Sequence, residues 1–135
     1  MIIWDAKLST GNERIDSQHK MLIEKLNEFE KIISDNSSGD IRLAAGEVLD
    51  FLQFYATWHF SQEEQLMDEV NCPVAEINKI AHARFLDMFG KFYTQWQIAS
   101  MDNELARSTY HQLSDWVTNH IMTVDVELNF CSHAE

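Results

Sequence analysis

Apolar residues recur in steps of three and four along most of this chain, and this spacing constrains its fold more than any other feature. Because such steps match the 3.6-residue turn of an α-helix, they place the apolar side chains on one face of a helix. The only proline is Pro73, so most of the chain is free to be helical. The first face carries Ile15, His19, Leu22, Leu26, Phe29 and Ile33.

Three further segments repeat this spacing and predict three more helices. Turn-forming residues at 34–40, 70–73 and 99–103 separate the segments. We expect Asp16 or Ser17 to cap the first helix, Asp40 to cap the second, and Pro73 to lie in the first turn of the third. The core positions of the three segments are Val48, Leu52, Ala56, His59, Glu63 and Leu66, then Ile77, Asn78, His82, Phe85, Phe89, Phe92 and Trp96, then Leu113, Val117, His120, Val124 and Leu128.

Short loops between amphipathic helices force neighbours to run antiparallel. The sequence therefore predicts an all-α fold, an up-down-up-down antiparallel four-helix bundle, formed by one domain over residues 1–135. The stripe of Phe85, Phe89, Phe92 and Trp96 is expected to pack in its core.

The net charge of -12 makes the surface repel nucleic-acid phosphates and anionic lipid, which excludes both as primary partners. No apolar run approaches the roughly 20 residues that span a bilayer, and residues 1–10 lack the pattern of a signal peptide. We therefore expect a cytoplasmic protein. Cys72 and Cys131 are too few for a disulfide framework, and we expect both to be reduced.

Five polar residues occupy core positions where the spacing predicts Leu or Phe. They are His19, His59, Glu63, His82 and His120. Burying a polar or charged group without a partner costs several kcal/mol, on the order of 2–7 for a neutral group. These side chains must therefore share a partner inside the bundle.

A metal satisfies such a set, because imidazole and carboxylate are good ligands for divalent iron, zinc or manganese. His59 and Glu63 lie one turn apart on one helix face, as do Asn78 and His82. One histidine on an apolar face is more often a hydrogen-bonded core residue. Four histidines on four helices, with a nearby carboxylate, favour a metal site instead.

Other polar residues give weaker signals. Asp125 follows His120 by five residues, a rotation of roughly 140° on an ideal helix, which places it only at the edge of the core face. His111 lies off the core face and His133 lies in the terminal tail, so we expect both to be solvated.

Three motifs resemble those of bacterial hemerythrins. The opening segment has Trp4, then GNE at 11–13 and IDSQHK at 15–20. Residues 59–67 (HFSQEEQLM) resemble the H-F-x-x-E-E-x-x-M signature, and residues 116–125 (WVTNHIMTVD) resemble the W-x-x-x-H-I-x-x-x-D ending. The resemblance covers almost the whole chain.

This resemblance implies an oxo- or hydroxo-bridged pair of irons. One iron would be held by His19 and His59 and the other by His82 and His120, with Glu63 and Asp125 bridging them. The resemblance thus selects Asp125, which spacing left marginal. It also implies a dry dioxygen pocket lined by Leu22, Phe60, Trp116, Val117 and Ile121.

One position departs from the family pattern. The third family motif is H-x-x-x-H, whereas residues 78–82 read NKIAH, so Asn78 stands where a histidine ligand is usual. Asn78 can ligate weakly through its amide oxygen, hydrogen-bond a metal-bound water, or turn away. With each alternative we expect exchangeable positions on both irons, the second iron included, whereas the usual site of the family leaves only one open.

The sequence leaves three functions open, with dioxygen and small anions as the expected ligands. The first, favoured by the exchangeable position, is an oxygen or redox sensor regulating a C-terminal output such as a diguanylate cyclase. The second is a stand-alone oxygen carrier or store. The third is a ferritin-like di-iron oxidase, which the scarcity of core carboxylates disfavours. We therefore expect a binding or sensing domain rather than an enzyme.

Overall fold

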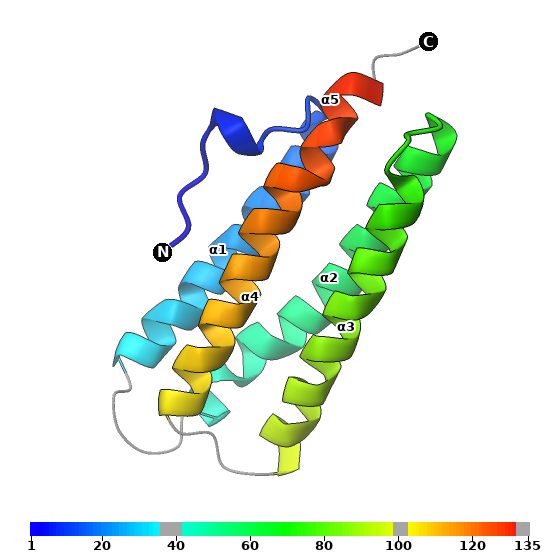
Figure 1. Cartoon of the computed structure of the whole chain (residues 1–135). Coiled ribbons are helices and arrows are strands. Elements are labelled where there is room, and N and C mark those ends of the chain that lie inside the picture. The colour runs from blue at the N-terminus through cyan, green and yellow to red at the C-terminus, as the bar shows by residue number, and fades with distance from the viewer. Residues whose placement is uncertain (36–41, 99–102, 132–135) are drawn as a thin grey trace.

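The computed structural model describes residues 1–35, 42–98 and 103–131, in which four long helices form an antiparallel bundle (Figure 1). The helix α1 packs on α2 and α4, and α3 packs on the same two helices. This arrangement confirms the predicted up-down-up-down bundle. No helix among the described residues has the length and apolarity to cross a membrane. The long helices are α1 (Glu13–Asp35), α2 (Arg42–Glu69), α3 (Ala75–Ile98) and α4 (Asn103–Thr123).

Most of the predicted core positions are buried, including the stripe of Phe85, Phe89, Phe92 and Trp96 on α3. Ile77 is an exception, because 58% of its surface is exposed. Neighbouring helix residues are about 100° apart, and Asn78 takes the inward direction at this point of α3.

The first turn of α1 is capped by Asn12, not by Asp16 or Ser17 as the sequence suggested. The Asn12 Oδ1 accepts a hydrogen bond from the Ile15 backbone N–H at 3.0 Å. The Asp16 carboxylate instead accepts hydrogen bonds from Ser9 and Thr10, at 2.7 and 2.8 Å. It thereby ties the N-terminal segment, with its short helix η1 (Ala6–Leu8), to α1.

The chain reverses between α2 and α3 through a hydrogen-bonded turn. Asn71 adopts a left-handed backbone with φ of 50°. The Cys72 N–H donates to the Met67 carbonyl at 2.9 Å and the Asn71 N–H to the Asp68 carbonyl at 3.2 Å, which is a Schellman motif. The break predicted at 70–73 is confirmed, but Pro73 precedes the first residue of α3 by two positions instead of lying in its first turn.

The other two predicted breaks are only partly described. Helix α1 runs through Ser34 to Asp35, so the break predicted to begin at Ser34 starts later. The expected cap Asp40 lies outside the described residues, as do residues 99–102 of the third break.

The last predicted helix is shorter than the spacing indicated. Helix α4 ends at Thr123, and the chain continues as a 3-10 helix, η2 (Asp125–Glu127), and one further turn, α5 (Leu128–Cys131). Val124 is accordingly only half-buried. Leu128 remains in the core because the tighter turn of η2 redirects the chain toward α1 and α2.

Cys72 and Cys131 form a disulfide, contrary to the prediction that both are reduced. Their Cα atoms are 5.3 Å apart although 59 positions separate them in sequence. Spacing along the chain could not indicate this pair, because the antiparallel packing alone brings the turn after α2 beside the end of α5.

Two apolar clusters fill the bundle. The larger cluster extends along all four long helices, from Leu8 to Ile121. The smaller one, which we call the disulfide cluster, contains Ile15, Met67, Cys72, Leu128 and Cys131. The first half of α1, the end of α2, the start of α3 and the end of α4 lie at this same end of the bundle (Figure 1).

The disulfide should stabilise the metal-free fold by roughly 4 kcal/mol, because it closes a loop of about 60 residues in the unfolded chain. We expect Cys131→Ser to lower the free energy of unfolding by about that amount in urea. Reductant should lower the parent to the level of the variant and leave the variant unchanged. Two free thiols in the air-oxidised parent, measured by thiol titration under denaturing conditions, would contradict the pairing.

Candidate metal centre

Six polar side chains that the sequence singled out lie together near the disulfide end of the bundle. Each is at most 7% exposed. A polar group so deeply buried requires a compensating partner. They come from every long helix and from η2: His19 from α1, His59 and Glu63 from α2, His82 from α3, His120 from α4 and Asp125 from η2.

The first group of ligand atoms forms around His19. Its Nε2 lies 3.1 Å from Glu63 Oε2 and 3.1 Å from Asp125 Oδ2. The Nε2 of His59 lies 3.6 Å from the same Glu63 oxygen. These four side chains can offer one ligand atom each to a single ion.

The second group contains His82 and His120 with the same two carboxylates. His82 Nε2 lies 3.4 Å from Glu63 Oε1, and His120 Nε2 lies 3.1 Å from Asp125 Oδ1. The two Nε2 atoms are 3.2 Å apart. Each carboxylate therefore turns one oxygen toward each group, which is the arrangement of a bridging ligand.

These separations fit a metal ion. Ligands 2.0–2.2 Å from an ion in neighbouring octahedral positions are about 3 Å from one another. A set of imidazoles and carboxylates without thiolate suits iron, as well as zinc or manganese. The His19 Nδ1 atom is buried without a hydrogen bond within the protein, and the buried Asp125 Oδ1 has only the 3.1 Å contact with His120 Nε2. An ion at the Asp125 oxygen would satisfy one of these two atoms.

The end of α4 explains why helical spacing left Asp125 marginal. A continuous α-helix would turn Asp125 to the edge of the core face, but α4 stops at Thr123. The 3-10 geometry of η2 points the Asp125 side chain inward, where it is 1% exposed. Only the motif resemblance could select this residue from the sequence.

Gln18 and Glu64, which the sequence did not mark as site residues, contact the Nδ1 atoms of two clustered histidines. The Gln18 Oε1 lies 2.6 Å from His59 Nδ1, and Glu64 Oε2 lies 2.9 Å from His82 Nδ1. An N–H at each Nδ1 leaves the lone pair at Nε2 free to face the centre. The second glutamate of the HFSQEE segment was the available signal for Glu64, whereas nothing singled out Gln18.

Without a metal, protons balance the charge of the two carboxylates. Burial lowers the pKa of His19, but hydrogen bonds to Asp125 and Glu63 outweigh it and raise that pKa to about 10. Burial alone would raise the pKa of Asp125, yet His120 and His19 hold it well below its usual range. Burial, with the charge of His19, lowers the pKa of His59 to about 3.

Asn78 points into the cluster and is fully buried. Its Nδ2 donates to Glu63 Oε1 at 2.9 Å and to Met67 Sδ at 3.2 Å. Its Oδ1 lies 2.7 Å from His120 Nε2. In this structure the side chain therefore does not turn away, and its amide oxygen lies beside the second group of ligand atoms.

An apolar cavity of about 20 Å³ adjoins the cluster. Such a volume holds about one molecule of the size of water. Its walls include His19, His59, His120 and Asp125. All five residues expected around dioxygen also line it, namely Leu22, Phe60, Trp116, Val117 and Ile121.

The remaining histidines take no part in this cluster as far as the described residues extend. His111 is exposed on α4 and its ring contacts Tyr110. His133 lies outside the described residues.

Comparison with known proteins gives consistent matches. Residues 10–128 match the family described as the hemerythrin HHE cation binding domain. The bacteriohemerythrin of Stenotrophomonas maltophilia (strain R551-3) is 31% identical over 121 residues, covering 90% of this chain and 74% of that protein. The bacteriohemerythrin of Clostridium acetobutylicum is 24% identical over 130 residues, covering 94% of this chain and 98% of that protein.

The fold agrees with these relatives. A crystal structure of wild-type hemerythrin matches with a TM-score of 0.82 and 25% identity, covering 99% of each chain. The matched family segment also contains all six clustered side chains. The resemblance of the motifs is thereby confirmed: this chain belongs to the hemerythrin family.

Proposed function

We propose that this domain holds two iron ions and binds dioxygen as an oxygen or redox sensor. The observation that carries the proposal is the division of six buried side chains into two groups that share both carboxylates. His19 and His59 would hold one iron, His82 and His120 the other, and Glu63 with Asp125 would bridge them.

Two ferrous ions would supply electrons and an open coordination position for dioxygen. The protein contributes a small chamber beside that position. Leu22, Val117 and Ile121 present hydrocarbon to the cavity, and Phe60 and Trp116 add aromatic walls. Such a lining excludes water and protons, which would otherwise promote loss of electrons from the irons.

The carrier alternative draws support from the same lining, because a dry cavity slows oxidation. Asn78 supports the sensor. An amide oxygen is a weaker donor than imidazole, and it lies beside His120 where the family has a further histidine. The second iron would thus keep an exchangeable position for water, small anions or dioxygen, which favours rapid oxidation over storage.

A sensor needs an output, and we propose a C-terminal signalling domain, such as a diguanylate cyclase, as its partner in a cytoplasmic protein. The reading frame of the gene beyond Glu135 tests this point directly. A natural stop codon immediately after Glu135 would favour the carrier.

Protein produced with iron supplied should contain two irons per chain, because two separate groups of ligand atoms are present. Metal analysis by mass spectrometry, together with the charge-transfer absorption of the ferric protein, measures this. Exchange of Glu76, which is exposed in the first turn of α3, for Gln is a control and should leave the iron content unchanged. One zinc per chain after iron-replete production would contradict the di-iron centre.

The metal-free and iron-loaded proteins should respond oppositely to pH. In the metal-free fold His19 has a pKa of about 10 against an ordinary value of 6.5, so its stabilising contribution is complete below about 6.5 and disappears as the pH rises toward 10. Iron binding requires neutral histidines, so the iron-loaded protein should gain stability from pH 6 to 8. Thermal melting of both forms across this range measures the effect, and parallel curves would contradict it.

Asn78→His should fill the exchangeable position, because it restores an imidazole one turn before His82. We expect the ferrous variant in air to oxidise more slowly than the parent, and added azide to bind more slowly or more weakly. Both are followed by the absorption of the iron centre. A variant that keeps two irons yet oxidises at the parental rate would remove the structural support for the sensor.

A further inference from the structure

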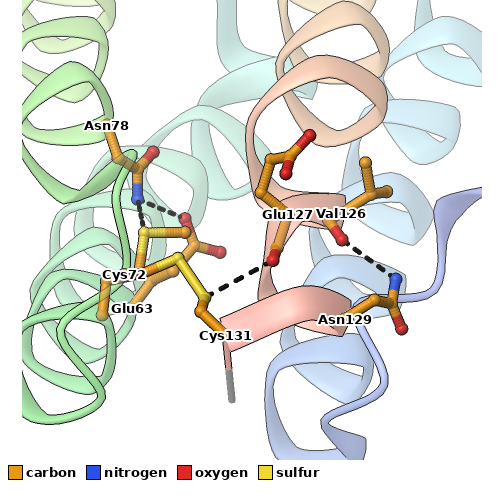
Figure 2. Close-up of a disulfide and its surroundings, with 8 residues drawn as sticks. Glu63, Cys72, Asn78, Val126, Glu127, Asn129 and Cys131 are labelled. Atoms are coloured by element: carbon orange, nitrogen blue, oxygen red, sulfur yellow. Dashed lines mark hydrogen bonds between the residues drawn. A yellow bond between two sulfur atoms is a disulfide. The ribbon is translucent and has the colours of Figure 1, made fainter. Parts of the chain in front are cut away.

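The Cys72–Cys131 disulfide is connected to the metal centre through Met67 and Asn78. Both cysteines belong to the disulfide cluster with Met67, and Met67 Sδ accepts a hydrogen bond from Asn78. Figure 2 shows the surroundings of the disulfide, including Glu63 and the hydrogen bonds that Asn78 donates. The bond therefore joins the turn between α2 and α3 to the segment that follows α4.

The two cysteines are held very differently. Cys72 is fixed to the end of α2 by the Schellman motif, with its N–H bonded to the Met67 carbonyl. Cys131 lies in α5, a helix of only four residues. A single helical turn is marginal by itself, because helix nucleation is unfavourable. The disulfide is the covalent restraint on α5, beside the burial of Leu128 and the hydrogen bond from Asn129 to the Ser9 carbonyl.

The restrained segment also carries Asp125. The helices η2 and α5 are continuous from Asp125 to Cys131. The Glu127 N–H donates to the Val124 carbonyl, and the Cys131 Sγ lies 3.4 Å from the Glu127 carbonyl oxygen. Asp125 is the clustered carboxylate that does not come from a long helix, and it belongs to both ligand groups.

We propose that Cys72–Cys131 is a thiol–disulfide exchange site for a dithiol reductant, and that its redox state determines how firmly Asp125 is held at the metal centre. The inference rests on the proposed iron centre for its metal readout only. The effect on residues 124–131 can be measured without iron.

The exchange is balanced in atoms and electrons. A thiolate of the dithiol attacks Cys131 Sγ, the S–S bond breaks, and Cys72 leaves as a thiolate that takes up a proton. The second thiol of the reductant then displaces Cys131 from the mixed disulfide. The dithiol loses two electrons and two protons and becomes a disulfide, and Cys72 and Cys131 become two thiols.

Access to the sulfur atoms requires only local opening. The disulfide is buried, with Cys72 4% and Cys131 5% exposed, but its sequence neighbours are at the surface. Phe130 is 77% exposed, and Asn71 and Pro73 are exposed. Unfolding of the single turn α5 would present Cys131 without disturbing the long helices, as is usual for the least stable part of a fold.

The first test uses the oxidised iron-loaded protein and reduced thioredoxin as the dithiol probe. We expect reduction to accelerate iron release to a ferrous chelator by about tenfold or more, the change produced by roughly 1.4 kcal/mol. In metal-free protein, reduction should speed backbone hydrogen exchange at residues 124–131 by a larger factor than in the middle of α1 to α4, where only the loss of global stability acts. Equal release rates, or the same acceleration of exchange at 124–131 as in the middle of the long helices, would overturn the proposal.

Two variants separate the effect of the disulfide on Asp125 from general destabilisation. Val48→Ala weakens the core near the start of α2, roughly 30 Å from its other end, and keeps the disulfide. We expect its iron release to stay at the parental rate. In Asp125→Asn, release should already be fast, and reduction should add little.

Each contrary outcome has a distinct meaning. If iron release from Val48→Ala is as fast as from the reduced parent, then the effect of reduction is explained by lost stability alone, and the proposal is overturned. An undiminished effect of reduction in Asp125→Asn would show that the disulfide does not act through Asp125. If the parent binds no iron yet shows the change in hydrogen exchange at 124–131, the proposed function is refuted. The restraint of residues 124–131 by the disulfide would still hold.

Discussion

Six ionisable side chains buried in an apolar bundle are the constraint on which this structure depends. Each would cost several kcal/mol if isolated, on the order of 2–7 for a neutral group, so their burial is tolerable only if they meet. They meet because every long helix contributes to one interior level, between the larger apolar cluster and the disulfide cluster. The metal-free protein meets the same demand with protons, since His19 is protonated between Asp125 and Glu63.

The parts of this arrangement that repeat with the helix turn could be predicted from the sequence. His59 and Glu63 are one turn apart on α2, and the position of His82 on its core face follows from the phenylalanines after it. Ile77 shows the limit of the rule, because apolar character alone did not reveal which of two neighbours faces inward. Helical spacing could not predict that the Asp125 side chain faces inward, because its direction depends on where α4 ends.

Features that depend on tertiary neighbours could not be predicted in the same way. The cap of α1 is Asn12, because Asp16 is already engaged by Ser9 and Thr10 of the preceding segment. The disulfide joins positions 59 residues apart, and only the antiparallel packing places them together. Disulfides are rare in reducing cytosol, so this bond is at odds with the cytoplasmic location that we propose if its role is purely structural. The disulfide and a cytoplasmic location are compatible if the bond is opened and closed by thiol–disulfide exchange.

The centre is therefore built from parts of unequal rigidity. Five of its side chains stand on long helices that pack on two neighbours each, whereas Asp125 stands on a short segment restrained by a disulfide. A ligand on such a short segment is the one whose occupancy a modest free energy can change, because local opening needs far less than global unfolding. Asn78 adds a second adjustable point, since its amide is bonded to Glu63 and Met67 and leaves its oxygen beside His120. Asn78 contacts Met67 of the disulfide cluster, and Asp125 stands on the segment that ends at Cys131, so a change in thiol state would reach the bridging carboxylate and the weak-donor position together.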